Sequence, residues 1–129
     1  MFEDIVLDVD EEFDLATPDE QKKLISNTLL SIEINRSKSQ GMVTDRLGRC
    51  FIIMVDNAIG RKWFHPTTFS EDLKNEALLA LVRIYGHISI NPYAYFHTII
   101  QQSIERGIDA KKKQSYITDI LKENILCQQ

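Results

Sequence analysis

One long stretch of helical periodicity, residues 91–113, constrains the fold more than any other feature of the chain. Asn91 followed by Pro92 is typical of a helix start, because Asn accepts hydrogen bonds from unpaired amides and Pro has no amide to lose at the first helical position. Behind this start, large apolar residues recur every four positions: Phe96, Ile100, Ile104 and Ile108. This spacing predicts an amphipathic helix of about five turns or more, with one buried face.

The opposite face of this helix is polar and leads into a basic cluster. Arg and Gln side chains can hydrogen-bond to base edges, and Lys side chains neutralise phosphates, so such a face is suited to nucleic acid. An ordinary solvated helix face would have the same composition, and the pattern alone leaves both interpretations open. The polar residues are His97, Thr98, Gln101, Gln102, Glu105 and Arg106, followed by Lys111, Lys112 and Lys113.

Length and composition indicate a single soluble domain. The chain has 129 residues, of which 43% are hydrophobic and 26% charged, as in ordinary globular proteins. No apolar run approaches the roughly 18–20 residues that a membrane helix needs, and the first residues are acidic where a signal peptide would be basic. Cys50 and Cys127 are too few for a disulfide framework or a zinc site. We therefore expect a cytoplasmic protein that does not associate with membranes.

The net charge of −4 hides an asymmetry along the chain. Residues 1–20 contain nine acidic and no basic residues, so the rest of the chain is mildly basic. An acidic arm on a basic body is compatible with a nucleic-acid partner. Apolar and acidic residues alternate in residues 1–16, which we interpret as an acidic arm, either extended or disordered.

The remaining sequence predicts helices and no strand pair. Capping boxes at Thr17 and Thr68 mark two helix starts, and a further start is expected at Thr44 or Asp45. Gly107 is a candidate bend point in the long helix. The expected helices cover residues 18–35, 44–62, 68–85 and 91–113, with a loop at 36–41 and a last helix, continuous or restarted, at 115–127. The predicted fold class is all-α: one compact helical bundle over residues 17–129, with a C-terminal helical tail.

No group of residues has the spacing of a catalytic or metal site. His65, His87 and His97 lie on three different segments, without the spacing that places two ligands on one helix face. Cys50 lies on an apolar helix with no histidine at a fixed spacing, so a nucleophilic role is not expected. The chain also has no glycine-rich phosphate loop. We expect neither enzymatic activity nor a cofactor.

Two segments together resemble region 2 of bacterial RNA polymerase sigma factors. Residues 70–85, SEDLKNEALLALVRIY, are similar to the sigma helix that docks on the clamp helices of the polymerase's largest subunit. Residues 95–108, YFHTIIQQSIERGI, are similar to the helix that melts and reads the −10 element. The Asn-Pro-x-x-Tyr opening at 91–95 and the lysine-rich exit at 111–113 resemble the late-transcription sigma factors of large tailed bacteriophages. The resemblance covers about residues 49–120.

The resemblance implies a phage-type sigma factor that binds core polymerase and directs it to late promoters through a −10-like element in the host cytoplasm. The implied polymerase-binding residues are Asp72, Asn75, Glu76, Leu78 and Val82. The implied DNA-binding residues are Tyr95, His97, Thr98, Gln101, Gln102, Arg106, Lys111, Lys112 and Lys113. Late phage sigma factors also end in a peptide that engages a sliding clamp, so the C-terminal tail is a candidate site for a clamp or a co-activator.

The sequence departs from housekeeping sigma factors at one important place. Thr98 and Ile99 stand where those proteins have a tryptophan pair that stacks on unpaired bases. Stacking contributes roughly 1–3 kcal/mol per base, so we expect weak melting unless Tyr93, Tyr95 or His97 replaces the pair. Two alternatives stay open: a helical regulator that occupies the sigma site on polymerase without reading DNA, and an unrelated small helical domain.

Overall fold

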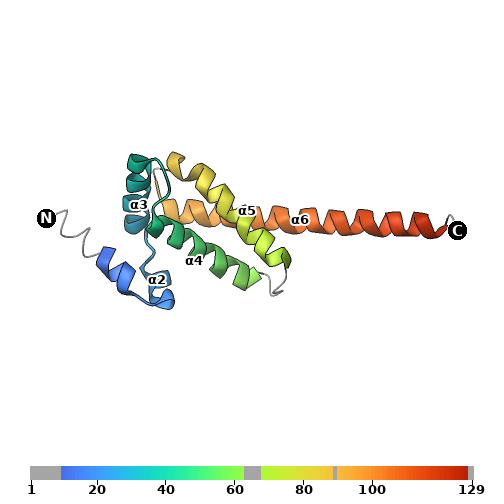
Figure 1. The fold of residues 1–129 in the computed structure, drawn as a ribbon, viewed down its shortest axis with the longest axis horizontal. Coiled ribbons are helices and arrows are strands. Elements are labelled where there is room, and N and C mark those ends of the chain that lie inside the picture. Colours follow the sequence, from blue (N-terminus) through green and yellow to red (C-terminus); the bar gives the residue numbers. More distant parts are fainter. Residues whose placement is uncertain (1–9, 63–67, 89, 128–129) are drawn as a thin grey trace.

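Helices form every regular element in the described part of the chain (Figure 1). The computed structural model describes residues 10–62, 68–88 and 90–127. Within these ranges there is no strand, and the predicted all-α class is confirmed. A short helix covers residues 10–15, followed by α2 (Pro18–Leu24), α3 (Asn27–Gln40), α4 (Asp45–Lys62), α5 (Thr68–Ile84), the 3₁₀ turn η1 (Tyr85–His87) and α6 (Pro92–Cys127).

The core lies where α3, α4 and α5 pack around the first half of α6. The predicted stripe on α6 is confirmed, because Phe96, Ile100 and Ile104 are fully buried. Phe96 meets Phe51 of α4 edge to face, with ring centroids 5.0 Å apart, a geometry that aromatic pairs favour. The other large, fully buried apolar side chains are Phe13, Leu29, Leu30, Leu47, Leu73, Leu81 and Val55.

The long helix α6 is continuous and runs straight in Figure 1, so the predicted bend at Gly107 is not seen. Gly107 lies against α5 instead, and a Cβ atom at this position would overlap the side chain of Leu73. The glycine therefore permits the close approach of α5 to α6. Of the two alternatives for the last helix, the continuous one is confirmed, because residues 92–127 form one helix whose second half projects beyond the bundle (Figure 1).

The predicted helix over residues 18–35 is two helices. α2 ends at Leu24, and Ser26 starts α3 by accepting a hydrogen bond from the Leu29 amide at 3.2 Å. α3 then continues to Gln40, where Gly41 adopts a left-handed φ of 77° and donates its amide to the Ser37 carbonyl. The predicted loop at 36–41 is therefore wrong.

Part of the predicted N-terminal arm belongs to the folded domain. Residues 10–15 are helical, and Phe13 is only 1% exposed, so an extended or disordered state is wrong for this part of the arm. The buried Gln21 amide donates to the Phe13 carbonyl at 2.8 Å, and its oxygen accepts from Arg49 Nε at 2.9 Å. These bonds connect the short helix to α2 and α4. Residues 1–9 lie outside the described part of the chain.

A buried carboxylate holds α3 and α4 together. Glu33 is fully buried and accepts from Arg36 Nη1 at 2.8 Å and from Thr44 Oγ1 at 2.9 Å. Arg46 Nη1 lies 3.8 Å from the same carboxylate. A buried charge is tolerated only with such partners, and removing one of them leaves the other uncompensated. Arg36 is therefore held in the helix at a position where the sequence predicted a loop.

The same arginines bind the N-terminal segment. Arg36 Nη1 lies 2.8 Å from an oxygen of Asp10, which is itself buried. Arg46 donates to both oxygens of Asp14, at 3.0 and 2.7 Å, a bidentate geometry that fixes both groups. Two acids of the arm are thus paired with the body of the domain.

The contact at Gly107 generates a stability prediction with a matched control. Gly107→Ala adds a Cβ that Leu73 must make room for, which costs typically about 1–3 kcal/mol and outweighs the gain of about 1 kcal/mol in helix propensity. Gly60→Ala in α4 adds a Cβ with no atom within 4 Å, so it should stabilise by about 0.5–1 kcal/mol. Urea unfolding followed by circular dichroism measures both. Equal stabilisation by the two variants would contradict the close contact.

Candidate interaction surfaces of α5 and α6

The outer face of α5 is an exposed stripe of acidic, amide and apolar side chains. Asp72, Asn75, Glu76 and Val82, four of the five predicted polymerase-binding residues, are all exposed. Asn75 and Val82 lie opposite the buried residues, which are Leu73, Ala77 and Leu81, whereas Asp72 and Glu76 lie toward α6. The spacing of three and four residues places the exposed side chains in one row along the helix. We call this row, together with Leu79, the α5 stripe.

The fifth predicted residue, Leu78, does not belong to this row, whereas its neighbour Leu79 does. Leu78 is half-buried and packs against the core, whereas Leu79 is 49% exposed. The periodicity of the helix contains this information, since Leu79 is four residues after Asn75 and three before Val82. Sequence reasoning missed Leu79 because the resemblance, and not the periodicity, selected Leu78.

An ion pair fixes α5 against α4. Lys74 Nζ lies 2.8 Å from Asp56 of α4 and 3.7 Å from Glu71 one turn earlier. The hydrogen bond with Asp56 is the main cause that raises the pKa of Lys74 above its usual value, with smaller contributions from the charges of both acids. Lys74 therefore remains charged at neutral pH.

The start of α6 is held by another helix. The predicted cap residue, Asn91, has a left-handed φ of 49°, and its carbonyl accepts from the Tyr95 amide at 3.3 Å. The side chain that accepts from the first turn is Asn27 of α3, whose Oδ1 lies 2.9 Å from the Tyr93 amide. Asn27 thereby positions the whole polar face of α6 relative to α3.

The predicted DNA-binding residues of α6 divide between two faces. Tyr95, Thr98, Gln102 and Arg106 are exposed and follow one another at intervals of three and four residues, so they form one row. His97 is half-buried, and its Nε2 lies 2.9 Å from Gln101 Nε2. His97 and Gln101 lie on a different side of the helix from the exposed row.

The three lysines do not form a single basic patch. Lys111, Lys112 and Lys113 are all exposed, but consecutive helical residues are separated by about 100° around the axis. Lys111 lines the groove between α5 and α6, while Lys113 continues the row of Tyr95 and Arg106. That these three lysines hold phosphates stays a prediction.

A groove of about 590 Å³ lies between α5 and α6. The small residues Ser103, Gly107 and Ala110 of α6 line it, and the close approach of the two helices is at Gly107. Its walls contain acidic residues of α5 and basic residues of both helices: Asp72, Glu76 and Arg83 from α5, with Arg106 and Lys111 from α6. Asp72 and Glu76, which the sequence assigned to polymerase, and Arg106 and Lys111, which it assigned to DNA, thus line a single groove.

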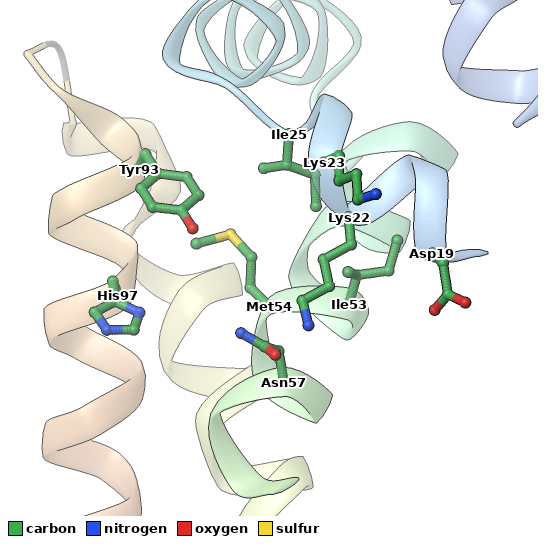
Figure 2. A pocket seen from close by; sticks show the side chains of 9 residues that line it. All are labelled: Asp19, Lys22, Lys23, Ile25, Ile53, Met54, Asn57, Tyr93 and His97. Atoms are coloured by element: carbon green, nitrogen blue, oxygen red, sulfur yellow. The ribbon is translucent and has the colours of Figure 1, made fainter. Parts of the chain in front are cut away.

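A second hollow, of about 460 Å³, lies between α2, α4 and α6 (Figure 2). Tyr93 and His97 enter it from α6, facing Met54 and Asn57 of α4. Lys22 of α2 points toward Asn57 across the same space (Figure 2). Aromatic rings beside a lysine can accommodate a planar ring and an anion. Sequence reasoning missed the α2 lysines, Lys22 and Lys23, because no local pattern indicates that α2 ends beside α6.

The side chains that the structure describes include no group of metal ligands and one buried thiol, that of Cys50. Among them, no three His, Cys, Asp or Glu side chains are grouped as metal ligands. Burial, with a smaller contribution from the charge of Glu33, raises the pKa of the buried Cys50 thiol to about 12. Since the thiolate is the nucleophile, Cys50 is poorly reactive at neutral pH. The side chain of His65 lies outside the described residues.

Comparisons of this chain with models of protein families, with curated proteins and with solved structures gave no match. No helix in the described ranges is both long and apolar enough to cross a bilayer. The residues and geometry of the chain itself are therefore the basis for inferring what it does.

Proposed function

We propose that the protein is a sigma-like subunit that binds bacterial core RNA polymerase through the α5 stripe. The observation that carries the proposal is the α5 stripe itself: two acids and an amide beside two aliphatic side chains, Leu79 and Val82, that are 49% and 46% exposed. Aliphatic side chains grouped on a surface and bordered by polar residues are typical of docking sites. A helical hairpin with basic and apolar residues, such as the polymerase clamp helices, is the complementary partner.

In this proposal, α6 directs the polymerase to a −10-like element of late promoters. The exposed row of Tyr95, Thr98, Gln102 and Arg106 offers one aromatic ring and three hydrogen-bonding side chains to DNA. Ile99 is partly buried against the core, so it is not available to stack on a base. Tyr93 and His97, beside the lysines of α2, supply an aromatic surface and positive charge in its place.

One observation favours the second candidate, a regulator that occupies the sigma site without reading DNA. The lysines of α6 point in different directions, and the exposed acids Glu105 and Asp109 lie between them and the first half of the helix. Like charges near phosphates weaken binding to DNA. Both candidates use the α5 stripe in the same way, and they differ only in the role of α6.

Charge reversal on the α5 stripe tests binding to core polymerase, the step that both candidates share. We expect Asp72→Arg/Glu76→Arg to weaken binding to core polymerase by about tenfold or more, because it places positive charge against a basic partner. Glu11→Arg/Glu12→Arg makes the same change in net charge at two exposed residues of the N-terminal helix and should bind like the unmodified chain. Fluorescence anisotropy of the labelled chain measures both affinities. Equal affinities for the two variants would exclude docking through α5.

A second pair of substitutions distinguishes the two candidates. Thr98→Glu/Gln102→Glu changes two exposed residues of the α6 row that do not line the groove with α5, so core binding should persist while promoter-directed initiation is lost. Initiation in vitro from a supercoiled late-promoter template measures this effect. Unchanged initiation would favour the regulator.

The hollow between α2, α4 and α6 generates a separate prediction. In complex with core polymerase, Lys22→Glu should weaken binding to a single-stranded −10 oligonucleotide by about five- to tenfold at low salt, because a phosphate neighbour is replaced by a like charge. Lys38→Glu is the control, since Lys38 is exposed on α3 and lines none of the hollows described above. A filter-binding titration measures both. Equal losses would show a general charge effect with no contribution from the hollow.

A further inference from the structure

The projecting half of α6 exposes apolar side chains that have no partner in the bundle (Figure 1). Tyr116 is 69% exposed and Ile120 38% exposed, and their neighbours Ile117 and Leu121 are also exposed. An isolated helix of this length is only marginally stable in water, and its stability normally comes from packing of an apolar face. A second helix along this segment would supply that packing.

Four exposed residues form a seam with the spacing of a coiled coil. Lys113, Tyr116, Ile120 and Glu123 are separated by three, four and three residues, which is the heptad pattern of an interhelical contact. The seam faces away from α5, because Ile120 is 13 residues after Gly107 and therefore about 220° further around the helix. A partner helix on the seam does not meet the bundle.

The charges of the seam select its occupant and the orientation of that occupant. In an antiparallel pair centred on Thr118, Tyr116 lies opposite the partner's Ile120, and Lys113 lies opposite the partner's Glu123. A parallel pair would place Lys113 against the same lysine and Glu123 against the same glutamate, which is unfavourable. The seam is therefore complementary to itself in the antiparallel direction.

The other exposed apolar pair on this segment, Ile117 and Leu121, is not flanked by charges that are complementary in an antiparallel pair. If Ile117 lay opposite the partner's Leu121, the flanking positions of the same pattern would be Gln114 and Asn124, which carry no charge that could select the partner or its direction. Ile117 and Leu121 also lie toward the side of α6 that carries Ala110 and Gln114, which line the groove with α5.

We propose that the protein self-associates through antiparallel pairing of the seam Lys113, Tyr116, Ile120 and Glu123 in two copies of α6. Pairing about Thr118 overlaps residues 109–127 of each α6, so the two bundles lie at opposite ends of a two-helix rod about 28 Å long. Each copy then covers the projecting segment of the other. The inference does not depend on the proposed function.

Sedimentation equilibrium of the full chain tests the proposal. Because the seam is short, we expect a weak dimer, with the average mass rising from 14.9 kDa toward twice that value between about 1 µM and about 500 µM protein. Ile120→Asp should raise the dissociation constant about tenfold or more, since both copies carry the change. Leu121→Asp, on the neighbouring side of the helix, should leave it within about threefold.

A charge swap tests the orientation. Lys113→Glu should weaken the dimer, and Lys113→Glu/Glu123→Lys should restore it, because the swapped pair is again complementary across the antiparallel seam. Lys122→Glu makes the same charge change on the opposite side of the helix and should have little effect. A chain that stays at 14.9 kDa throughout, a dimer that depends on Leu121 and not on Ile120, or a swap that fails to restore association would each overturn the proposal.

Discussion

The close contact between Leu73 and Gly107 is the constraint on which the interaction surfaces depend. Because no Cβ intervenes, α5 lies directly on α6, and small residues of α6 line the groove between the helices. The α5 stripe and the exposed row of α6 are consequently held in one fixed arrangement relative to each other. Asn27 at the start of α6, and the ion pair of Lys74 with Asp56, fix the same arrangement from α3 and α4.

The buried Glu33 has a comparable role at the other end of the bundle. Arg36 and Arg46 neutralise it and also bind Asp10 and Asp14, so the N-terminal helix is attached through charges that the body of the domain requires. Such a group contributes less to net stability than to fixing one arrangement, because desolvation offsets much of the attraction. Asp10 and Asp14 of the N-terminal segment are therefore paired with arginines of the domain, whereas Glu11 and Glu12 are exposed on the same short helix.

The parts of this structure that the sequence predicted are those determined locally. Periodicity located α4, α5 and α6 and the buried stripe of Phe96, Ile100 and Ile104, because an amphipathic helix repeats its signal over several turns. The break at Ile25, the extension of α3 to Gln40 and the helix at 10–15 were missed. Each of them is stabilised by residues distant in sequence, which local patterns do not contain. For the interaction surfaces, four of the five residues that the sequence named on α5 are exposed, whereas the directions of the lysines required helix geometry.

The central claim is that the α5 stripe meets core RNA polymerase, and its most direct test is site-specific photo-crosslinking. A photoreactive amino acid at Leu79, 49% exposed within the stripe, is compared with the same amino acid at Ile52, 50% exposed on α4. The two side chains match in size and exposure, so non-specific capture should be equal. The account predicts a crosslink from position 79 to the largest polymerase subunit and a much weaker one from position 52. Equal crosslinking from both positions, or none from position 79 at saturating polymerase, would contradict it.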